Sequence, residues 1–252
     1  FEQRKDEYLN IVQDVLSRGA YIMQQDLIDF ENDLAKYLGV KHAIGVADGT
    51  MALLISLMAA GIGEGDEVIV PSHTFVASAA AIHHSGAKPV LADCQEDHLI
   101  DPNSISKLIT SKTKAIMPVQ LNGRVADMDA INKIATDHNL IIIEDSCQAL
   151  GARYKGQFAG TFGLTGTFSF FPAKTLGCFG DGGAVVTNND KVAEKIKMIR
   201  DHGRDPSDGK VKMFGFNSRL DNLQAAILGL KLKYYDEDVG RRRQIAALYH
   251  TH

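Results

Sequence analysis

The sequence predicts an α/β fold in which a mostly parallel β-sheet is covered by helices on both faces. Short apolar runs, such as residues 66–71 and 140–145, alternate along the chain with longer helical patterns. Strands separated by helices form βαβ units, and parallel strands buried on both faces are apolar almost throughout. The chain has 252 residues, of which 45% are hydrophobic and 23% charged, so it can bury a core of the size that a layered domain needs.

The first strongly periodic segment predicts a helix near residues 25–38. Leu27, Phe30, Leu34 and Leu38 fall on one helical face, and the glycine that follows is a natural stop. The remaining predicted helices cover 50–61, 75–86, 102–111, 127–138, 190–203 and 221–238. The predicted strands lie within 42–49, a short strand that ends in a turn, and cover 66–71, 88–93, 115–120, 140–145, 166–171 and 182–188. Because the last two strands are joined by a short Gly-rich loop, we expect the sheet to accommodate an antiparallel strand there.

Composition and charge narrow the classes of function. The net charge is −4, and the short triplet Arg241–Arg243 is best interpreted as a solvated helix face, so we expect no nucleic-acid partner. Cys94, Cys147 and Cys178 lack the spacing of a zinc site or a disulfide framework, which favours reduced cysteines and a cytoplasmic protein. No apolar run reaches the roughly 18 residues of a membrane span, and the charged N-terminus shows no signal peptide.

Ligands of such sheets bind beyond the carboxyl ends of the strands, so the polar residues that follow strands matter most. Asp48, Gly49 and Thr50 lie between a predicted strand and a buried apolar helix. Either the amides at the helix start bind an anion, or Asp48 or Thr50 simply caps the helix; taken alone, capping is the commoner case. The phosphate-loop pattern GxxxxGK[ST] and a GxGxxG after a strand are both missing from the sequence, which disfavours a nucleotide phosphate.

A carboxylate and a lysine complete the candidate chemistry. Asp145 ends an apolar strand, where it either caps the next element or pairs with a cation such as the ring nitrogen of a pyridoxal cofactor. Lys174 follows the aromatic pair Phe170 and Phe171 and precedes several glycines, a setting expected to lower the amine pKa. A neutral amine can form a Schiff base with an aldehyde. A lone lysine is usually a surface charge, but the anion site and Asp145 together favour covalent chemistry here, with Ser169 in reach of the same ligand's phosphate.

Six segments, in order along the chain, carry a resemblance to a known family. They are "GVADGTMAL", "DEVIVPSHTFVASAAAI", "GAKPVLAD", "IIIEDSCQALGARY", "FSFFPAKTLGCFGDGGAVVTNN" and "FGFNSRLDNLQAAIL". With them the chain resembles the DegT/DnrJ/EryC1/StrS family of pyridoxal-phosphate-dependent sugar aminotransferases. The resemblance implies a three-layer α/β/α large domain of a fold type I enzyme over residues 1–235, with N-terminal helices. It also implies that residues 236–252 begin a small C-terminal domain that is largely absent from this chain.

The resemblance assigns roles to individual residues. Lys174 holds pyridoxal 5'-phosphate as a Schiff base and later moves a proton between the substrate carbon and the cofactor. Asp145 pairs with the ring nitrogen, Gln148 bonds the ring hydroxyl, and Phe75 stacks on the ring. Without the resemblance, Phe75 is best interpreted as a core aromatic, and the alternatives are a helix-start residue for Gln148 and a turn residue for Asn217. The remaining cofactor contacts that it implies are phosphate ligands: Gly49, Thr50 and Ser169, together with Asn217 reaching the cofactor of the neighbouring subunit in a homodimer with shared active sites.

The implied activity is transfer of an amino group, from L-glutamate, to a nucleotide-linked keto-sugar. The alternatives are another fold type I enzyme such as an amino-acid lyase, or a non-catalytic cofactor-binding regulator. No metal site is predicted, since His83 and His84 are adjacent on a helix and the other dense histidines lie at the C-terminus. Gln120 and Asn122 stand where many family members have His and Tyr. We expect this segment to lie near the substrate and to affect the choice of sugar.

Overall fold

The computed structural model describes residues 4–250 of the chain, and for residue 250 it describes the backbone alone. The helices are α1 Lys5–Arg18, α2 Gln25–Leu38, α3 Gly49–Ala59, α4 Ala77–His84, α5 Pro102–Leu108, α6 Met128–Asp137, α7 Asp190–Arg200, α8 Asn222–Lys233 and α9 Tyr235–His250. The strands are β1 His42–Val46, β2 Glu67–Pro71, β3 Lys88–Ala92, β4 Thr113–Ile116, β5 Ile141–Asp145, β6 Arg153–Tyr154, β7 Gln157–Phe158, β8 Thr165–Ser169 and β9 Gly183–Thr187. The predicted order of helices and strands is confirmed.

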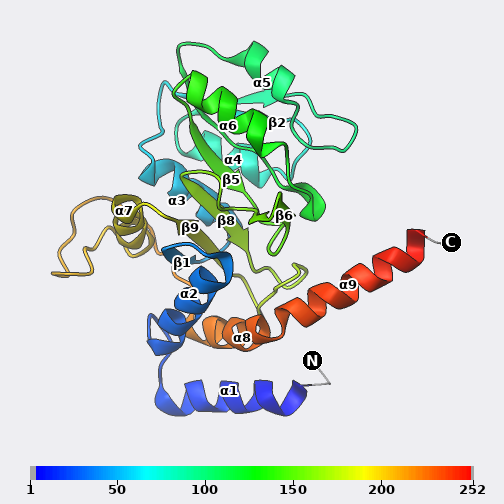
Figure 1. Ribbon diagram of the computed structural model, residues 1–252. Helices are drawn as coiled ribbons and strands as arrows, with labels where there is room; N and C mark the ends of the chain where they lie inside the picture. The colour runs from blue at the N-terminus through cyan, green and yellow to red at the C-terminus, as the bar shows by residue number, and fades with distance from the viewer. Residues whose placement is uncertain (1–3, 251–252) are drawn as a thin grey trace.

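Seven of these strands form one mixed sheet in the order β1-β9-β8-β5-β4-β2-β3 (Figure 1). Every neighbouring pair is parallel except the two pairs that involve β9, which runs antiparallel to both β1 and β8. The expected antiparallel strand is therefore β9. The connection from β8 to β9, residues 170–182, consists of turns and contains no helix of the kind that a parallel crossover uses.

Helices cover both faces of the sheet, as an α/β/α sandwich requires. Ala43 of β1 and Val186 of β9 pack with α2 and α8 on one face. Their sequence neighbours Ile44 and Val185 pack with α3 and α7 on the other. Successive side chains of a strand point to opposite faces, so strands buried on both sides are apolar at every position. This is the physical origin of the apolar runs from which the fold class was predicted.

Two short departures from the predicted elements have simple causes. The strand expected over 115–120 ends at Ile116, because Pro118 has no amide to donate to the ladder, and pairing resumes as a bridge between Val119 and Asp145. The β6–β7 hairpin has two residues in each strand, too few to show an alternating pattern in the sequence.

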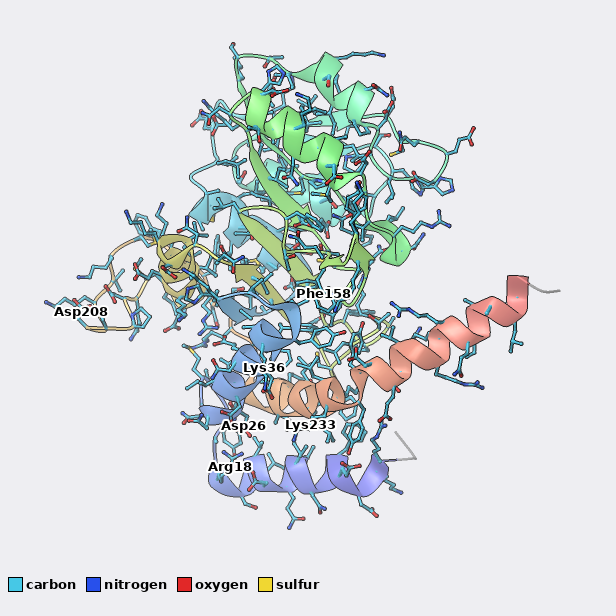
Figure 2. The ribbon with its side chains drawn as sticks, in the orientation of Figure 1. Arg18, Asp26, Lys36, Phe158, Asp208 and Lys233 are labelled. Carbon is cyan, nitrogen blue, oxygen red and sulfur yellow. The ribbon has the colours of Figure 1, made fainter. Side chains whose placement is uncertain are left out.

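The N-terminal helices are fixed to the body by polar contacts, of which the ion pair between α1 and α2 is exposed and those with α8 are half-buried or buried. Arg18 of α1 donates to Asp26 of α2 at 3.0 Å, and Figure 2 shows the two side chains directed toward one another. Asn222, at the start of α8, donates to Asp26 at 2.6 Å and accepts from the amide of Leu27 at 3.0 Å. α1, α2 and α8 therefore form one packed unit beneath the sheet.

Helix α9 extends away from the rest of the folded chain. Residues 241–249 are all exposed, and Figure 1 shows α9 extending away from the helices around it. The predicted boundary at residue 235 coincides with the first residue of this helix. The division into a large domain and the beginning of a smaller one stays a prediction.

Candidate active site

The predicted site residues come from segments that end at one edge of the sheet. β1 and β8 are both antiparallel to β9, so they run in the same direction as each other, and β5 is parallel to β8. The carboxyl ends of these strands therefore lie together. Gly49 follows β1, Asp145 ends β5 and Ser169 ends β8, which places all three at the edge where ligands of open α/β sheets bind.

A cradle forms between the start of α3 and the end of β8. A Cβ atom added at Gly49 would lie 2.8 Å from Cβ and 3.2 Å from Oγ of Ser169, so the backbone of the helix start touches this serine closely. Asp48 caps α3 through its side chain, which accepts from the amide of Met51 at 2.9 Å. The capping interpretation is thus confirmed for Asp48. The amides of Gly49 and Thr50 precede the first intrahelical hydrogen bond, so they suit an anion.

Asp145 is held by neutral donors at the end of β5. It is 6% exposed, its Oδ2 accepts from the hydroxyl of Ser78 at 2.7 Å, and its Oδ1 accepts from the amide of Cys147 at 3.2 Å. Two donors without charge orient the carboxylate but do not neutralise it. A buried carboxylate of this kind is stabilised by a cation, and a protonated ring nitrogen fits that requirement.

The loop that carries Lys174 is compact. The Lys174 amide donates to the carbonyl of Phe171 at 2.8 Å, and the side chain is half-buried. A Cβ added at Gly177 would lie 2.7 Å from the carbonyl oxygen of Pro172, which only a glycine tolerates. The expectation that the glycines let this loop bend tightly is confirmed at that position.

Cys147 connects the lysine with the aspartate. Burial raises the pKa of the Cys147 thiol, the carboxylate of Asp145 raises it further, and the ammonium group of Lys174 opposes both. The thiol thus lies within electrostatic reach of both charged groups. It is also 3.8 Å from Oγ1 of Thr167 and 3.1 Å from the position of a Cβ at Gly49.

Sequence reasoning missed two residues of this cluster, Cys147 and Ser78. Both stand inside segments that carry the family resemblance, two residues after Asp145 and three after Phe75. A hydroxyl among alanines in the short helix α4 was the available signal for Ser78. Its contact with Asp145 joins two segments 67 residues apart, which the linear sequence does not show.

Gln148 and Phe75 lie next to the cluster. Gln148 is half-buried, and its Oε1 accepts from the amide of Asn122 at 2.9 Å. Phe75 is 68% exposed, so its ring is open to a ligand, and its carbonyl accepts from the amide of Ser78, whose hydroxyl donates to Asp145. The interpretation of Phe75 as a core aromatic is therefore wrong.

Asn217 belongs to the long loop after α7, whose residue Asp208 lies far out from the body in Figure 2. Its side chain is exposed, and Oδ1 accepts from Nε of Arg219 at 3.0 Å. The adjacent Ser218 accepts from the amide of Ala47 at 3.3 Å, which ties this loop to the end of β1. The role of Asn217 in a second subunit stays a prediction.

Gln120 corrects one expectation. It is completely buried: Oε1 accepts from the amide of Ala126 at 2.8 Å, and Nε2 donates to Glu144 at 3.0 Å. Its side chain therefore holds the interior together and is not free to meet a substrate. Asn122, by contrast, is exposed and adjoins Gln148 through its amide.

Within residues 4–250, no group of three or more His, Cys, Asp or Glu side chains is arranged to hold a metal ion. His83 and His84 lie 5.5 Å apart between ring centroids, and the histidine side chains at 250 and 252 lie outside the described residues. In the same part of the chain the three cysteines are free, and no helix is long and apolar enough to cross a membrane.

Comparison with known proteins places this geometry in a family. The sequence model of the DegT/DnrJ/EryC1/StrS aminotransferase family matches residues 2–252. A dTDP-3-amino-3,4,6-trideoxy-alpha-D-glucose transaminase of Streptomyces venezuelae is 45% identical, over 99% of this chain and 66% of its own. A protein of Geobacillus stearothermophilus named as a pleiotropic regulatory protein is also 45% identical, over 99% of this chain and 67% of its own. The chain thus spans about two thirds of these relatives.

Two solved structures are similar throughout. DesV of S. venezuelae, in complex with a ketimine intermediate, superimposes with a TM-score of 0.96 at 44% identity, covering 100% of this chain and 68% of its own. NtdA of Bacillus subtilis, with bound cofactor PMP, gives a TM-score of 0.87 at 38% identity, covering 93% and 54%. These likenesses confirm the predicted fold class. By its sequence and its fold, the chain belongs to the DegT/DnrJ/EryC1/StrS aminotransferase family.

Proposed function

We propose that this chain forms the cofactor-binding part of an aminotransferase that uses pyridoxal 5'-phosphate to move an amino group from L-glutamate to a nucleotide-linked keto-sugar. The observation that carries the proposal is the convergence of Lys174, Asp145 and the Gly49–Ser169 cradle at one edge of the sheet. The transaminase name of the Streptomyces relative and the PMP bound to NtdA support the same reaction class.

The residues present fit the proposed cofactor. The amides at the start of α3 and the hydroxyls of Thr50 and Ser169 would hold the phosphate, in a cradle that a Cβ at Gly49 would fill. Asp145, oriented by Ser78, would hold the proton on the ring nitrogen. When bound, pyridoxal phosphate supplies an electron sink for the substrate carbon that carries the amine.

Other side chains would orient the ring. The exposed ring of Phe75 would cover one face of it and exclude water there. Gln148 would donate to the ring hydroxyl through its amide nitrogen, since its Oε1 already accepts from Asn122. Because Asn122 holds Gln148 in place, it affects cofactor orientation through that contact.

Lys174 would bind the cofactor covalently and then act as the general base. Its amine would take a proton from the substrate carbon next to the nitrogen and pass it to C4′ of the cofactor in the same half-reaction, and the transfer would run in reverse in the other half. A half-buried position within electrostatic reach of the Cys147 thiol limits the positions open to this amine. Positioning of this kind accounts for a large part of catalysis by proton transfer.

We also propose a homodimer with shared active sites. The loop after α7 carries Asn217 together with Phe214, which is 98% exposed, and Val211, which is 65% exposed. Apolar side chains exposed to this extent are typical of protein interfaces. The three free cysteines support a cytoplasmic location, and the outward course of α9 supports a second domain after residue 235.

The test is covalent trapping of the cofactor. Full-length protein loaded with pyridoxal phosphate and reduced with borohydride should carry the cofactor on Lys174, identified by peptide mass. Addition of L-glutamate should convert the bound cofactor to its amine form with release of 2-oxoglutarate, and a panel of nucleotide-linked keto-sugars should convert it back.

Two variants separate the outcomes. Lys174→Ala should lose covalent attachment and transfer, while Lys107→Ala, at an exposed position of α5, should retain both. Labelling at another lysine, or no cofactor bound, would contradict the proposal. If cells that carry only Lys174→Ala keep the phenotype of the wild type, the alternative of a non-catalytic cofactor-binding regulator is favoured. The name of the Geobacillus relative indicates that class.

A further inference from the structure

Tyr235 lies where the body of the chain meets helix α9, and its hydroxyl group bridges two loops. The side chain is 1% exposed. The hydroxyl donates to the carbonyl oxygen of Leu150 at 2.8 Å and lies 2.7 Å from Oγ1 of Thr175. Thr175 directly follows Lys174, and Leu150 comes two residues after Gln148. One buried hydroxyl therefore joins the loop of the lysine to the segment that carries Asp145 and Gln148.

The direction of both hydrogen bonds follows from the number of protons. A tyrosine hydroxyl has one proton, and here it is given to the carbonyl of Leu150. The hydroxyl of Thr175 must then donate to Tyr235. Burial raises the pKa of Tyr235, so its proton stays in place at neutral pH. The chain Thr175 to Tyr235 to Leu150 is a complete series in which each donor has its acceptor.

The ring of Tyr235 is fixed as well as its hydroxyl. Gly151 has φ of 79°, and a Cβ there would lie 3.2 Å from the Tyr235 ring and 3.2 Å from the Tyr37 hydroxyl. The two tyrosine rings meet edge to face at 5.8 Å, and the hydroxyl of Tyr37 donates to Asp236 at 2.9 Å. These contacts hold the start of α9 against the turn that follows Leu150.

We propose that Tyr235 is a positioning residue of the proposed active site, whose hydroxyl sets the separation between the Lys174 loop and the Asp145–Gln148 segment. Because Tyr235 is also the first residue of α9, a movement of that helix is passed to both segments at once. The inference rests on the proposed function for its catalytic meaning. The bridge itself involves only residues of this chain.

The first experiment measures the bridge without catalysis. Amide hydrogen exchange is followed in full-length protein, with and without pyridoxal phosphate, for wild type, Tyr235→Phe and Tyr234→Phe. Tyr234 is the matched control, since its hydroxyl donates to Glu7 of α1 at an exposed site. In Tyr235→Phe, peptides covering 171–178 and 149–152 should exchange about twofold to tenfold faster, the range expected for loss of a typical intramolecular hydrogen bond. The control should leave both peptides unchanged.

A second variant tests the same bond from its other end. Thr175→Val keeps the shape of the side chain and removes the donor, so peptide 171–178 should exchange faster, as in Tyr235→Phe, while the bond from Tyr235 to Leu150 remains. The double variant should add little to Tyr235→Phe, because Tyr235→Phe already removes the bond that Thr175→Val removes. Unchanged exchange in both single variants, or full additivity, would overturn the proposal.

Steady-state kinetics then show whether Tyr235 positions the catalytic groups or only stabilises the fold. In Tyr235→Phe, kcat should fall about tenfold while KM for the amino donor stays within about twofold, because misplacement of a catalytic group lowers the rate more than the binding. An unchanged kcat would refute the positioning role. A protein that binds no pyridoxal phosphate would refute the proposed function, whereas exchange measured without cofactor would still decide whether the bridge exists.

Discussion

The substitution Glu144→Gln tests the buried network behind the candidate site. Glu144 is 0% exposed on β5, next to Asp145 in the chain. Its carboxylate accepts four hydrogen bonds, from the amides of Gly160 at 2.8 Å, Phe162 at 2.6 Å and Gly163 at 3.0 Å, and from the side-chain amide of Gln120 at 3.0 Å. All four partners are donors, so the site requires two acceptor atoms.

Glutamine offers only one acceptor oxygen. That oxygen can keep two of the four bonds, and the other two donors then face an NH₂ group. A buried donor without an acceptor costs about 1–3 kcal/mol, which gives a gross loss of about 2–6 kcal/mol. Burial also raises the pKa of Glu144, which reflects the cost of holding a charge there, and the neutral glutamine removes that cost. We therefore expect a net loss in the lower part of the range, about 2–4 kcal/mol.

Urea denaturation of cofactor-free protein measures this loss as a change in the free energy of unfolding. The control is Glu64→Gln, at an exposed turn position, which should change the unfolding free energy by less than about 0.5 kcal/mol. A loss below about 1 kcal/mol for Glu144→Gln would refute the reasoning, because the four donors would then not depend on the carboxylate.

Three further substitutions test the site and its scaffold. Gly49→Ala brings a methyl group to 2.8 Å from Cβ of Ser169, so cofactor affinity, measured by fluorescence titration, should fall about tenfold or more; unchanged affinity would exclude this cradle. Ser78→Ala removes the donor to Asp145 and should lower the unfolding free energy by about 1.5–3 kcal/mol, an effect that must shrink when Asp145 is replaced by alanine. Asn189→Ala removes the cap of α7, so thermal unfolding should show a loss of about 1 kcal/mol with cofactor affinity intact.

Much of the architecture could be predicted from the sequence because it depends on local pattern. Leu27, Phe30, Leu34 and Leu38 are all buried on one face of α2, as their spacing predicts. The apolar runs became strands buried on both faces, and the helices between them made the sheet mostly parallel. Periodicity is a property of neighbouring residues, so it is readable before any tertiary contact forms.

The candidate site was predicted in part for a different reason. The ends of parallel strands meet at one edge whatever lies between them, so Asp145 and Gly49 were expected to be neighbours. The orientation of each side chain does not follow from that rule. Gln120 follows a strand in the same way, yet it points into the core and binds Glu144. Phe75 has the side chain of a core residue and is exposed.

By itself the sequence determined the fold class, the order of the elements and the edge at which chemistry is expected, since these depend on spacing and composition. The tertiary structure alone decided which distant residues meet there. Ser78 contacts Asp145, which is 67 positions away in the chain. Tyr235 joins Thr175, 60 positions before it, to Leu150, 85 positions before it. Contacts of this kind depend on how the helices pack on the sheet, and packing is a property of the whole folded chain that no local pattern encodes.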